Sequence, residues 1–203
     1  MEDSGTLMTV KSECQGIYKD KGSKFLSFGY SVTNEEEIKQ ILNRVRKKYH
    51  DARHCCFAFR IGIEEQYYRV NDDGEPSGTA GKPIFGQIES NNLTNILLVV
   101  VRYFGGKLLG TSGLINAYRS AAADCLSNTT FSECKPEVIF DVSFPYEEMN
   151  SVMRIIKDES LSIIEQHSDL DCRMKLSTEK KSYDSVSQRL SKLKSLKIKT
   201  VQG

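Results

Sequence analysis

An uninterrupted apolar run, ILLVVV (Ile96–Val101), constrains the fold of this chain more than any other stretch. Successive strand residues point to opposite faces, so a strand made only of Ile, Leu and Val has to be buried on both faces. Two glycine-rich stretches stand before and after it, DDGEPSGTAGKP (72–83) and RYFGGKLLGTSG (102–113). The first is too rich in Gly and Pro for a regular helix or an interior strand. The sequence therefore predicts a buried strand between two shaped loops.

Apolar periodicity predicts the other elements of the first 130 residues. Strands are expected at 24–32, 54–61 and 66–70, the last two as a hairpin. A helix is expected after an N-cap at Thr33 or Asn34, with acids in its first turn and the basic run 46–48 at its end. Two more are expected from Pro83 to about Glu89 and from about Thr111 to Leu126. The inner stripe of the last helix is predicted to be Leu114, Ala117, Tyr118, Ala121 and Cys125.

Residues 129–135 form a polar connection with no clear pattern, and the sequence predicts a domain boundary there. Beyond it the elements read β-α-β-β-α-β, which is the ferredoxin-like order. We therefore expect an α+β protein with an N-terminal domain over 1–130 and a ferredoxin-like C-terminal domain over 136–203. The expected strands are 138–144, 160–166, 171–178 and 196–201, and the expected helices are 146–157 and 180–193.

Composition favours a soluble cytoplasmic protein. Hydrophobic residues make up 39% and charged residues 27%, and the formal net charge of +1 gives no global field for nucleic acid or a membrane. The first residues do not read as a signal peptide, and the longest apolar run is too short to span a bilayer. The scattered Cys residues indicate reduced thiols rather than a disulfide framework. Locally, Lys180–Gly203 carries seven Lys and Arg residues against one acid, Asp184.

The second glycine-rich stretch suits an anion, most naturally a phosphate. It joins the buried strand to a helix, so backbone N–H groups and the helix N-terminus would face the same concavity. Arg102 and Lys107 would add positive charge, and Thr111 would cap the helix or hydrogen-bond an anion oxygen. The alternative is a strand-to-helix turn that needs Gly for positive φ and a hydroxyl for capping. The stretch fits neither a Walker A loop nor GxGxxG.

The first glycine-rich stretch has three carboxylates, on Asp72, Asp73 and Glu75. They could hold a divalent cation, but EF-hand spacing is absent and Asp-Asp-Gly is also an ordinary turn former. The residues just before the next helix offer a second candidate anion cradle, made of Ser77, Gly78, Thr79 and Gly81. His50, His54, Cys55 and Cys56 lack the spacing of a zinc site. No metal and no cofactor are predicted.

Four segments carry a close resemblance to the IMPACT/YigZ family. They are GSKFLSFGYSV (22–32), DARHCCFAFR (51–60), DDGEPSGTAGKP (72–83) and VVRYFGGKLLGTSGLINAYRSA (100–121). They follow the family's order and cover roughly residues 20–126. The remainder resembles the small ferredoxin-like domain of bacterial members.

The resemblance implies that the first domain takes the fold of domain IV of elongation factor G, of the β-α-β, ribosomal-protein-like type, and the second that of domain V. Eukaryotic relatives are associated with translational control, where they compete for a ribosome-associated activator of the kinase that responds to amino-acid starvation. The two-domain layout expected here does not include their partner-binding domain, so that partner is not expected to carry over. The shared surface of the family maps here onto Arg53, His54, Asp72, Asp73, Glu75, Ser77, Gly78, Thr79, Gly81, Arg102, Tyr103, Gly105, Gly106, Lys107, Gly110 and Thr111.

Three functions remain open at this point. The leading hypothesis is a non-catalytic, translation-linked regulator that binds RNA, the ribosome or a translation factor, with backbone contacts added by Lys180–Lys199. Neither a membrane partner nor DNA sequence specificity is expected. The alternative is an enzyme that acts on a small phosphorylated ligand or nucleotide at the same loops. The third is a protein-binding module.

Overall fold

The computed structural model describes residues 6–63, 65–168, 171–193 and 195–201. The ends of the expected domains, 1–5 and 202–203, lie outside this part of the chain. The chain has a mixed α and β fold and divides into two compact units, Met1–Cys134 and Lys135–Gly203. None of the helices in the described residues is long and apolar enough to cross a membrane.

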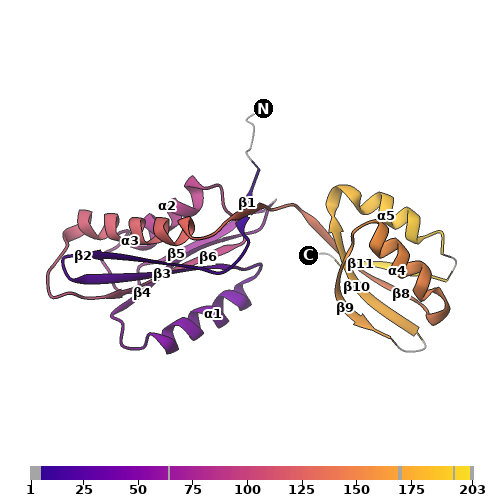
Figure 1. Ribbon diagram of the computed structural model, residues 1–203, viewed down its shortest axis with the longest axis horizontal. Helices are drawn as coiled ribbons and strands as arrows, with labels where there is room; N and C mark the ends of the chain where they lie inside the picture. The colour runs from indigo at the N-terminus through magenta and orange to yellow at the C-terminus, as the bar shows by residue number, and fades with distance from the viewer. Residues whose placement is uncertain (1–5, 64, 169–170, 194, 202–203) are drawn as a thin grey trace. The chain divides into compact units, whose positions relative to one another are not determined.

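The first unit is built on a five-stranded antiparallel sheet with the order β2-β3-β6-β4-β5. These strands are β2 (Cys14–Asp20), β3 (Ser23–Ser31), β4 (His54–Ile61), β5 (Tyr67–Asn71) and β6 (Ile96–Tyr103). Helix α1 (Glu35–Lys48) covers one side of the sheet, and α2 (Gly81–Ser90) and α3 (Gly110–Ser127) cover the other (Figure 1). The predicted strands and helices of this region are confirmed, although α2 begins at Gly81 rather than at Pro83.

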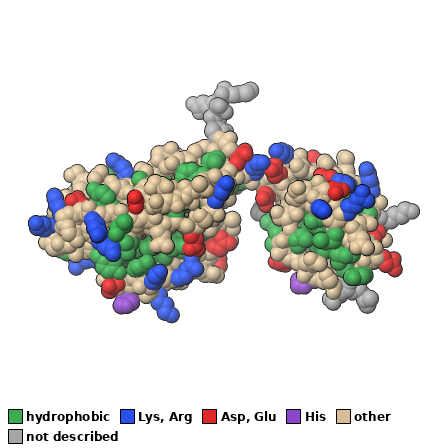
Figure 2. All heavy atoms as spheres, in the orientation of Figure 1, with side chains coloured by type: hydrophobic (Ala, Val, Ile, Leu, Met, Phe, Trp, Pro, Cys, Tyr) green, Lys and Arg blue, Asp and Glu red, His purple; other side chains and the backbone are tan. Residues whose placement is uncertain are grey.

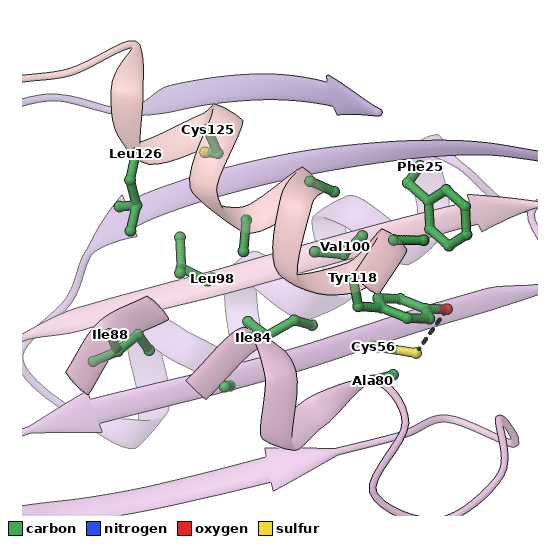
Figure 3. Packing of buried hydrophobic residues seen from close by; sticks show 14 of the residues in the cluster. Phe25, Cys56, Ala80, Ile84, Ile88, Leu98, Val100, Tyr118, Cys125 and Leu126 are labelled. Carbon is green, nitrogen blue, oxygen red and sulfur yellow. Dashed lines mark hydrogen bonds between the residues drawn. The ribbon is translucent and has the colours of Figure 1, made fainter. Parts of the chain in front are cut away.

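Strand β6 is buried on both faces, as predicted. It pairs with β3 on one edge and β4 on the other. Its side chains Ile96, Leu98 and Val100 pack into one hydrophobic cluster, while Leu97, Val99 and Val101 pack into another. Figure 3 shows the first cluster, in which Leu98 and Val100 meet Ile84 of α2 and Tyr118 of α3. The apolar run therefore forms the centre of the unit between its two helical layers.

Three strands of this unit were not predicted. Two of them, β1 (Met8–Val10) and β7 (Phe131–Glu133), pair with each other as a small separate sheet. The expectation of a patternless connection over 129–135 is therefore wrong, since β7 lies within it. The third is β2, whose Gly16 lies against α3: a Cβ there would come within 2.4 Å of the Cys125 backbone nitrogen. This glycine marks close packing of a helix on a strand, which the sequence does not reveal.

The second unit has the predicted order of strands and helices, β-α-β-β-α-β. Its elements are β8 (Glu137–Pro145), α4 (Met149–Asp158), β9 (Ser162–His167), β10 (Asp171–Glu179), α5 (Tyr183–Leu190) and β11 (Lys197–Val201), with short 3₁₀ turns at Tyr146–Glu148 and Lys180–Ser182. The antiparallel sheet has the order β11-β8-β10-β9. Helices α4 and α5 lie on one side of it (Figure 1). The core between them is made of Phe140, Val142, Phe144, Val152, Ile155, Ile156, Leu161, Cys172, Met174, Leu176, Val186 and Leu190.

Candidate functional site

The first glycine-rich loop folds around one of its own carboxylates. The backbone N–H groups of Gly78, Ala80 and Gly81 donate to the Asp72 carboxylate at 2.9, 3.0 and 2.8 Å. Burial opposes ionisation of Asp72, but these hydrogen bonds and the nearby Lys82 together hold the pKa of its carboxyl below its usual value. The anion cradle expected at Ser77–Gly81 therefore exists, but Asp72 fills it. Thr79 is turned inward as well, since its hydroxyl donates to the Pro76 carbonyl at 2.6 Å.

Asp73 connects the first glycine-rich loop to β4 and α1. Its carboxylate accepts the Cys55 backbone N–H at 2.7 Å and lies 3.2 Å from Arg46 of α1. Its carbonyl oxygen lies 2.8 Å from Nδ1 of His54. This contact holds His54 at the start of β4, where its Nε2 lies 3.8 Å from the Glu75 Oε1 atom. The carboxylates of the three acids thus point to different partners. Among the described residues no three His, Cys, Asp or Glu side chains are grouped to hold a metal.

Glu75 is the buried centre of the site. Its Oε1 lies 2.6 Å from a guanidinium nitrogen of Arg102 and accepts the Tyr118 hydroxyl at 2.8 Å. The Cys56 thiol donates in turn to the Tyr118 oxygen at 3.3 Å, as the dashed line in Figure 3 marks. Burial raises the pKa of Tyr118 far above its usual value, so the phenol stays neutral and remains a donor to Glu75. Glu75 and Arg102 therefore form a buried ion pair with a third hydrogen-bond partner.

Arg102 lies between two aromatic rings. Its guanidinium carbon is 5.5 Å from the ring centroid of Phe25 in the core and 5.5 Å from that of Phe104 at the surface. Such contacts suit a desolvated guanidinium. Tyr103, between Arg102 and Phe104 in sequence, packs on the opposite face and donates its hydroxyl to Asp51 at 2.9 Å. The ring of Phe104, and not that of Tyr103, therefore contacts the Arg102 guanidinium.

The second glycine-rich loop is shaped by close approach and by positive φ. A Cβ at Gly105 would lie 1.9 Å from the Gly22 carbonyl carbon, so the turn after β2 touches this loop through backbone alone. Gly106 and Gly110 have φ of +81° and +72°, which favour glycine. Lys107 is exposed. The loop ends at α3, whose first turn carries no acidic residue and whose N-cap, Leu109, offers no side-chain hydrogen bond. The N-terminal N–H groups of α3 are thus without a side-chain cap.

The two loops enclose a pocket of about 410 Å³. It is lined by Arg53, His54, Glu75, Pro76, Arg102, Phe104, Leu108, Leu109, Gly110, Thr111 and Leu114. One part of the wall is ionic or polar and the other part is apolar. Phe104 is 45% exposed and Leu108 is 85% exposed, which is unusual for side chains of this size. Pockets that combine an apolar wall with a few convergent polar groups are typical of ligand sites.

The pocket gathers six of the residues expected at the shared surface. They are Arg53, His54, Glu75, Arg102, Gly110 and Thr111. The others shape the loops or lie outside the lining: Asp72, Asp73, Ser77, Gly78, Thr79, Gly81, Tyr103, Gly105, Gly106 and Lys107. The leucine part of the apolar wall, Leu108 and Leu109, was not predicted. A Leu-Leu pair inside a glycine-rich loop was its available signal, because such a pair has no regular element to bury it.

Both loops fall within the part of the chain that matches a known family. Residues 21–126, just over half of the chain, match the Impact N-terminal domain. The chain belongs to the IMPACT family. The IMPACT family member YvyE of Bacillus subtilis is 29% identical over 195 residues, which cover 96% of this chain and 90% of that protein. The IMPACT family member YigZ of Escherichia coli is 34% identical over 138 residues, covering 67% of this chain and 68% of that protein.

The chain is also similar to a solved structure over its whole length. A crystal structure described as that of a hypothetical protein is 26% identical, with a TM-score of 0.73. The match covers 97% of this chain and 98% of that one, so both units have counterparts there. The fold of this IMPACT family member is thus found in a second chain along its whole length.

Proposed function

We propose that this IMPACT family member is a non-catalytic regulator of translation in the cytoplasm that binds RNA through the pocket between its two glycine-rich loops. Membership of the family supports the link to translation. The β-α-β-β-α-β order of the second unit supports a ferredoxin-like domain. We also propose that the two units resemble domains IV and V of elongation factor G in fold.

The observation that carries the proposal is the two-sided wall of the pocket. A nucleotide unit of RNA has a flat base, which stacks on exposed apolar and aromatic side chains, and a phosphate, which binds cations and free N–H groups. Phe104 and Leu108 offer the first kind of contact, and both are exposed. Arg53 and the uncapped N-terminus of α3 offer the second kind in the same pocket. The wall therefore matches the two chemistries of one nucleotide.

The acid in the pocket does not oppose this assignment. Glu75 is 2.6 Å from Arg102, so the two charges cancel within the wall. Arg53 is exposed and forms no ion pair within the described residues, which leaves the lining with a net positive charge. Lys107 adds a second exposed cation on the same loop. On the face drawn in Figure 2, Lys and Arg side chains are scattered among acidic ones, so attraction of a polyanion would be local to such sites.

Binding of a fluorescent single-stranded oligouridylate, followed by anisotropy, tests the proposal. Phe104→Ala should weaken binding roughly 5- to 150-fold, since loss of base stacking costs about 1–3 kcal/mol. Arg53→Ala should lower the slope of log affinity against log salt by about 0.7, the value for one phosphate contact. Arg69→Ala is the matched control, because Arg69 is exposed on β5 outside the pocket. Equal affinity of all three variants and the parent chain would contradict the assignment of the pocket as an RNA site.

Sedimentation with ribosomes and their subunits tests the link to translation. Co-sedimentation should weaken as salt rises and should be reduced by Lys107→Ala, because Lys107 is exposed on the second loop. Absence of co-sedimentation at every salt concentration would contradict direct association with the ribosome.

An enzyme acting on a small phosphorylated ligand is the second candidate. The observation in its favour is that a buried carboxylate, Glu75, and a half-buried imidazole, His54, converge in the same pocket. This candidate requires saturable turnover of a nucleotide or sugar phosphate that His54→Ala abolishes. The regulator proposed above predicts binding without turnover.

A further inference from the structure

We infer that the open face of the sheet in the second unit is a separate binding surface for single-stranded RNA, which it holds by the phosphate backbone. The inference takes RNA as the partner from the proposed function but uses none of the pocket residues. The two faces of this sheet differ in burial. Phe140, Val142 and Phe144 of β8 are buried against the helices. Since neighbouring side chains alternate, Asp141 and Ser143 face the other way.

A hollow of about 600 Å³ opens on this other face. Its charged lining consists of Arg173, Lys175, Lys197 and Lys199 together with Asp141, Glu165 and Asp171. The cations alone are not decisive, because three carboxylates accompany them. What matters is how the strand registers distribute the two kinds of charge.

The registers sort these side chains into two rows that cross the strands. In one row Lys199 faces Asp141, Asp141 faces Lys175, and Lys175 faces Glu165. Cations and carboxylates alternate there, and Lys175 is paired to Glu165 at 3.2 Å. This row neutralises itself.

The neighbouring row carries no carboxylate. It consists of Lys197 of β11, Ser143 of β8, Arg173 of β10 and His167 of β9. Lys197, Arg173 and His167 are exposed, and none of them forms an ion pair within the described residues. Three inter-strand gaps make the row about 14 Å long. We call these four residues the basic row.

Phosphate is the ligand that fits the basic row. Two permanent cations two strands apart, with a hydroxyl between them, can contact successive phosphates of a chain laid across the strands. Sheets that read RNA bases do so with exposed aromatic rings. Phe144 is the sole Phe, Tyr or Trp in the lining of this hollow, and it is buried. The row is therefore suited to the RNA backbone and has little means of reading sequence.

The carboxylates near the basic row lead to a second expectation, in which a substitution strengthens RNA binding. Glu165 lies in the self-neutralised row next to the basic row, and Asp171 lies two residues before Arg173 on β10. Both would repel an RNA strand on this face. Removing either charge should strengthen RNA binding, whereas removing a cation of the basic row should weaken it.

The test measures anisotropy of a labelled 20-nucleotide oligouridylate with the full chain over a range of salt concentrations. Replacing both Arg173 and Lys197 by Gln should weaken binding at low salt and lower the salt slope by about 1.4, equal to two contacts at about 0.7 each. Glu165→Gln should strengthen binding. Arg173→Lys combined with Lys197→Arg keeps both charges and should retain most of the affinity, which separates charge from misfolding.

The matched control replaces Lys157 and Lys192 by Gln. Both are exposed, belong to the helical side of the unit and lie outside the hollow, and the net charge changes equally. An equal loss in this control would overturn the basic row as a site, as would an unchanged slope in the Arg173 and Lys197 variant. If Phe104→Ala has no effect while the Arg173 and Lys197 variant loses affinity, the result contradicts the pocket as an RNA site and supports the basic row. No binding of RNA by the parent chain would overturn both.

Discussion

Glu75 and Arg102 are the two residues on which the shape of the pocket depends most. Their side chains are only 3% and 6% exposed, and the second guanidinium nitrogen of Arg102 lies 3.5 Å from Ser23 Oγ. Removing one partner of a buried ion pair leaves the other charge uncompensated. We expect Glu75→Gln to lower the free energy of unfolding of the first unit by about 3 kcal/mol, measured by urea denaturation.

The control for this variant is Glu36→Gln. Glu36 is 4.0 Å from Lys39, and both side chains are well exposed, so the loss should stay below about 1 kcal/mol. A loss of the same size in the two variants would mean that the buried pair has no special role in stability.

Asp72 makes the stability of the first loop depend on pH. Its pKa in the folded protein is lowered, mainly by the N–H groups of Gly78, Gly81 and Ala80, which outweigh the effect of burial. A lowered pKa means that the ionised form stabilises the fold above the usual pKa of the carboxyl. That stability is lost as the pH falls through the folded-state value. Between pH 6 and pH 3, the urea midpoint of the parent chain should therefore fall further than that of Asp72→Asn.

Asp20→Asn serves as the control for this pH series, because Asp20 has no hydrogen-bonded side chain in the described residues. Its midpoint should follow that of the parent chain at every pH. If Asp72→Asn also runs parallel to the parent chain, the carboxylate does not hold the loop through its charge.

The sequence reveals the residues of the site better than their contacts. Arg53, His54, Glu75 and Arg102 were expected at one surface and do line one pocket. The sequence could not show that Asp72 occupies the cradle, because an acid and a run of N–H donors in one loop suit an external anion equally well. The order of the loop holds a clue: the acid comes six to nine residues before the donors, close enough for the loop to close on itself.

At the scale of single elements, α1 follows from local rules. The Asn34 side chain accepts the Glu37 backbone N–H at 3.0 Å, and Glu37 reaches back to the Thr33 backbone N–H at 2.8 Å. Asn34→Ala should lower the free energy of unfolding by about 1 kcal/mol through loss of the cap. Asn43→Ala, the same substitution at an exposed position inside the helix, should raise it by up to about 0.7 kcal/mol through helix propensity. Urea denaturation of both variants checks the opposite signs, and a shift in the same direction would contradict the capping role.

Two of the three strands that the sequence did not predict, β1 and β7, depend on partners far away in the sequence. β1 and β7 have three residues each, too few for a clear alternation, and they pair Met8 with Glu133 across almost the whole first unit. β6 could be predicted because its uninterrupted run of Ile, Leu and Val requires burial on both faces. Local composition thus reveals an element that carries its own signal and misses one that exists only through pairing.

At the scale of the whole molecule, we propose that the chain consists of two independently cooperative domains, one on each side of residue 135. The first unit has two hydrophobic clusters, one on each side of its sheet, and the second has a separate cluster of its own. No residue is shared between the clusters of the two units. Because cooperativity comes from a shared core, we expect two unfolding transitions rather than one.

Two core substitutions test this expectation. Leu98→Ala removes a side chain that is 1% exposed in the first unit, and Leu176→Ala removes one that is 0% exposed in the second. Each should lower the free energy of unfolding of its own unit by about 2–5 kcal/mol and leave the other unchanged. Urea titration followed by residue-resolved NMR signals from both units separates the transitions, and Leu108→Ala, at a position 85% exposed, should move neither. If Leu176→Ala lowers the midpoint of both units, they unfold as one cooperative structure, and the pocket and the basic row would have to be treated as parts of a single folding unit.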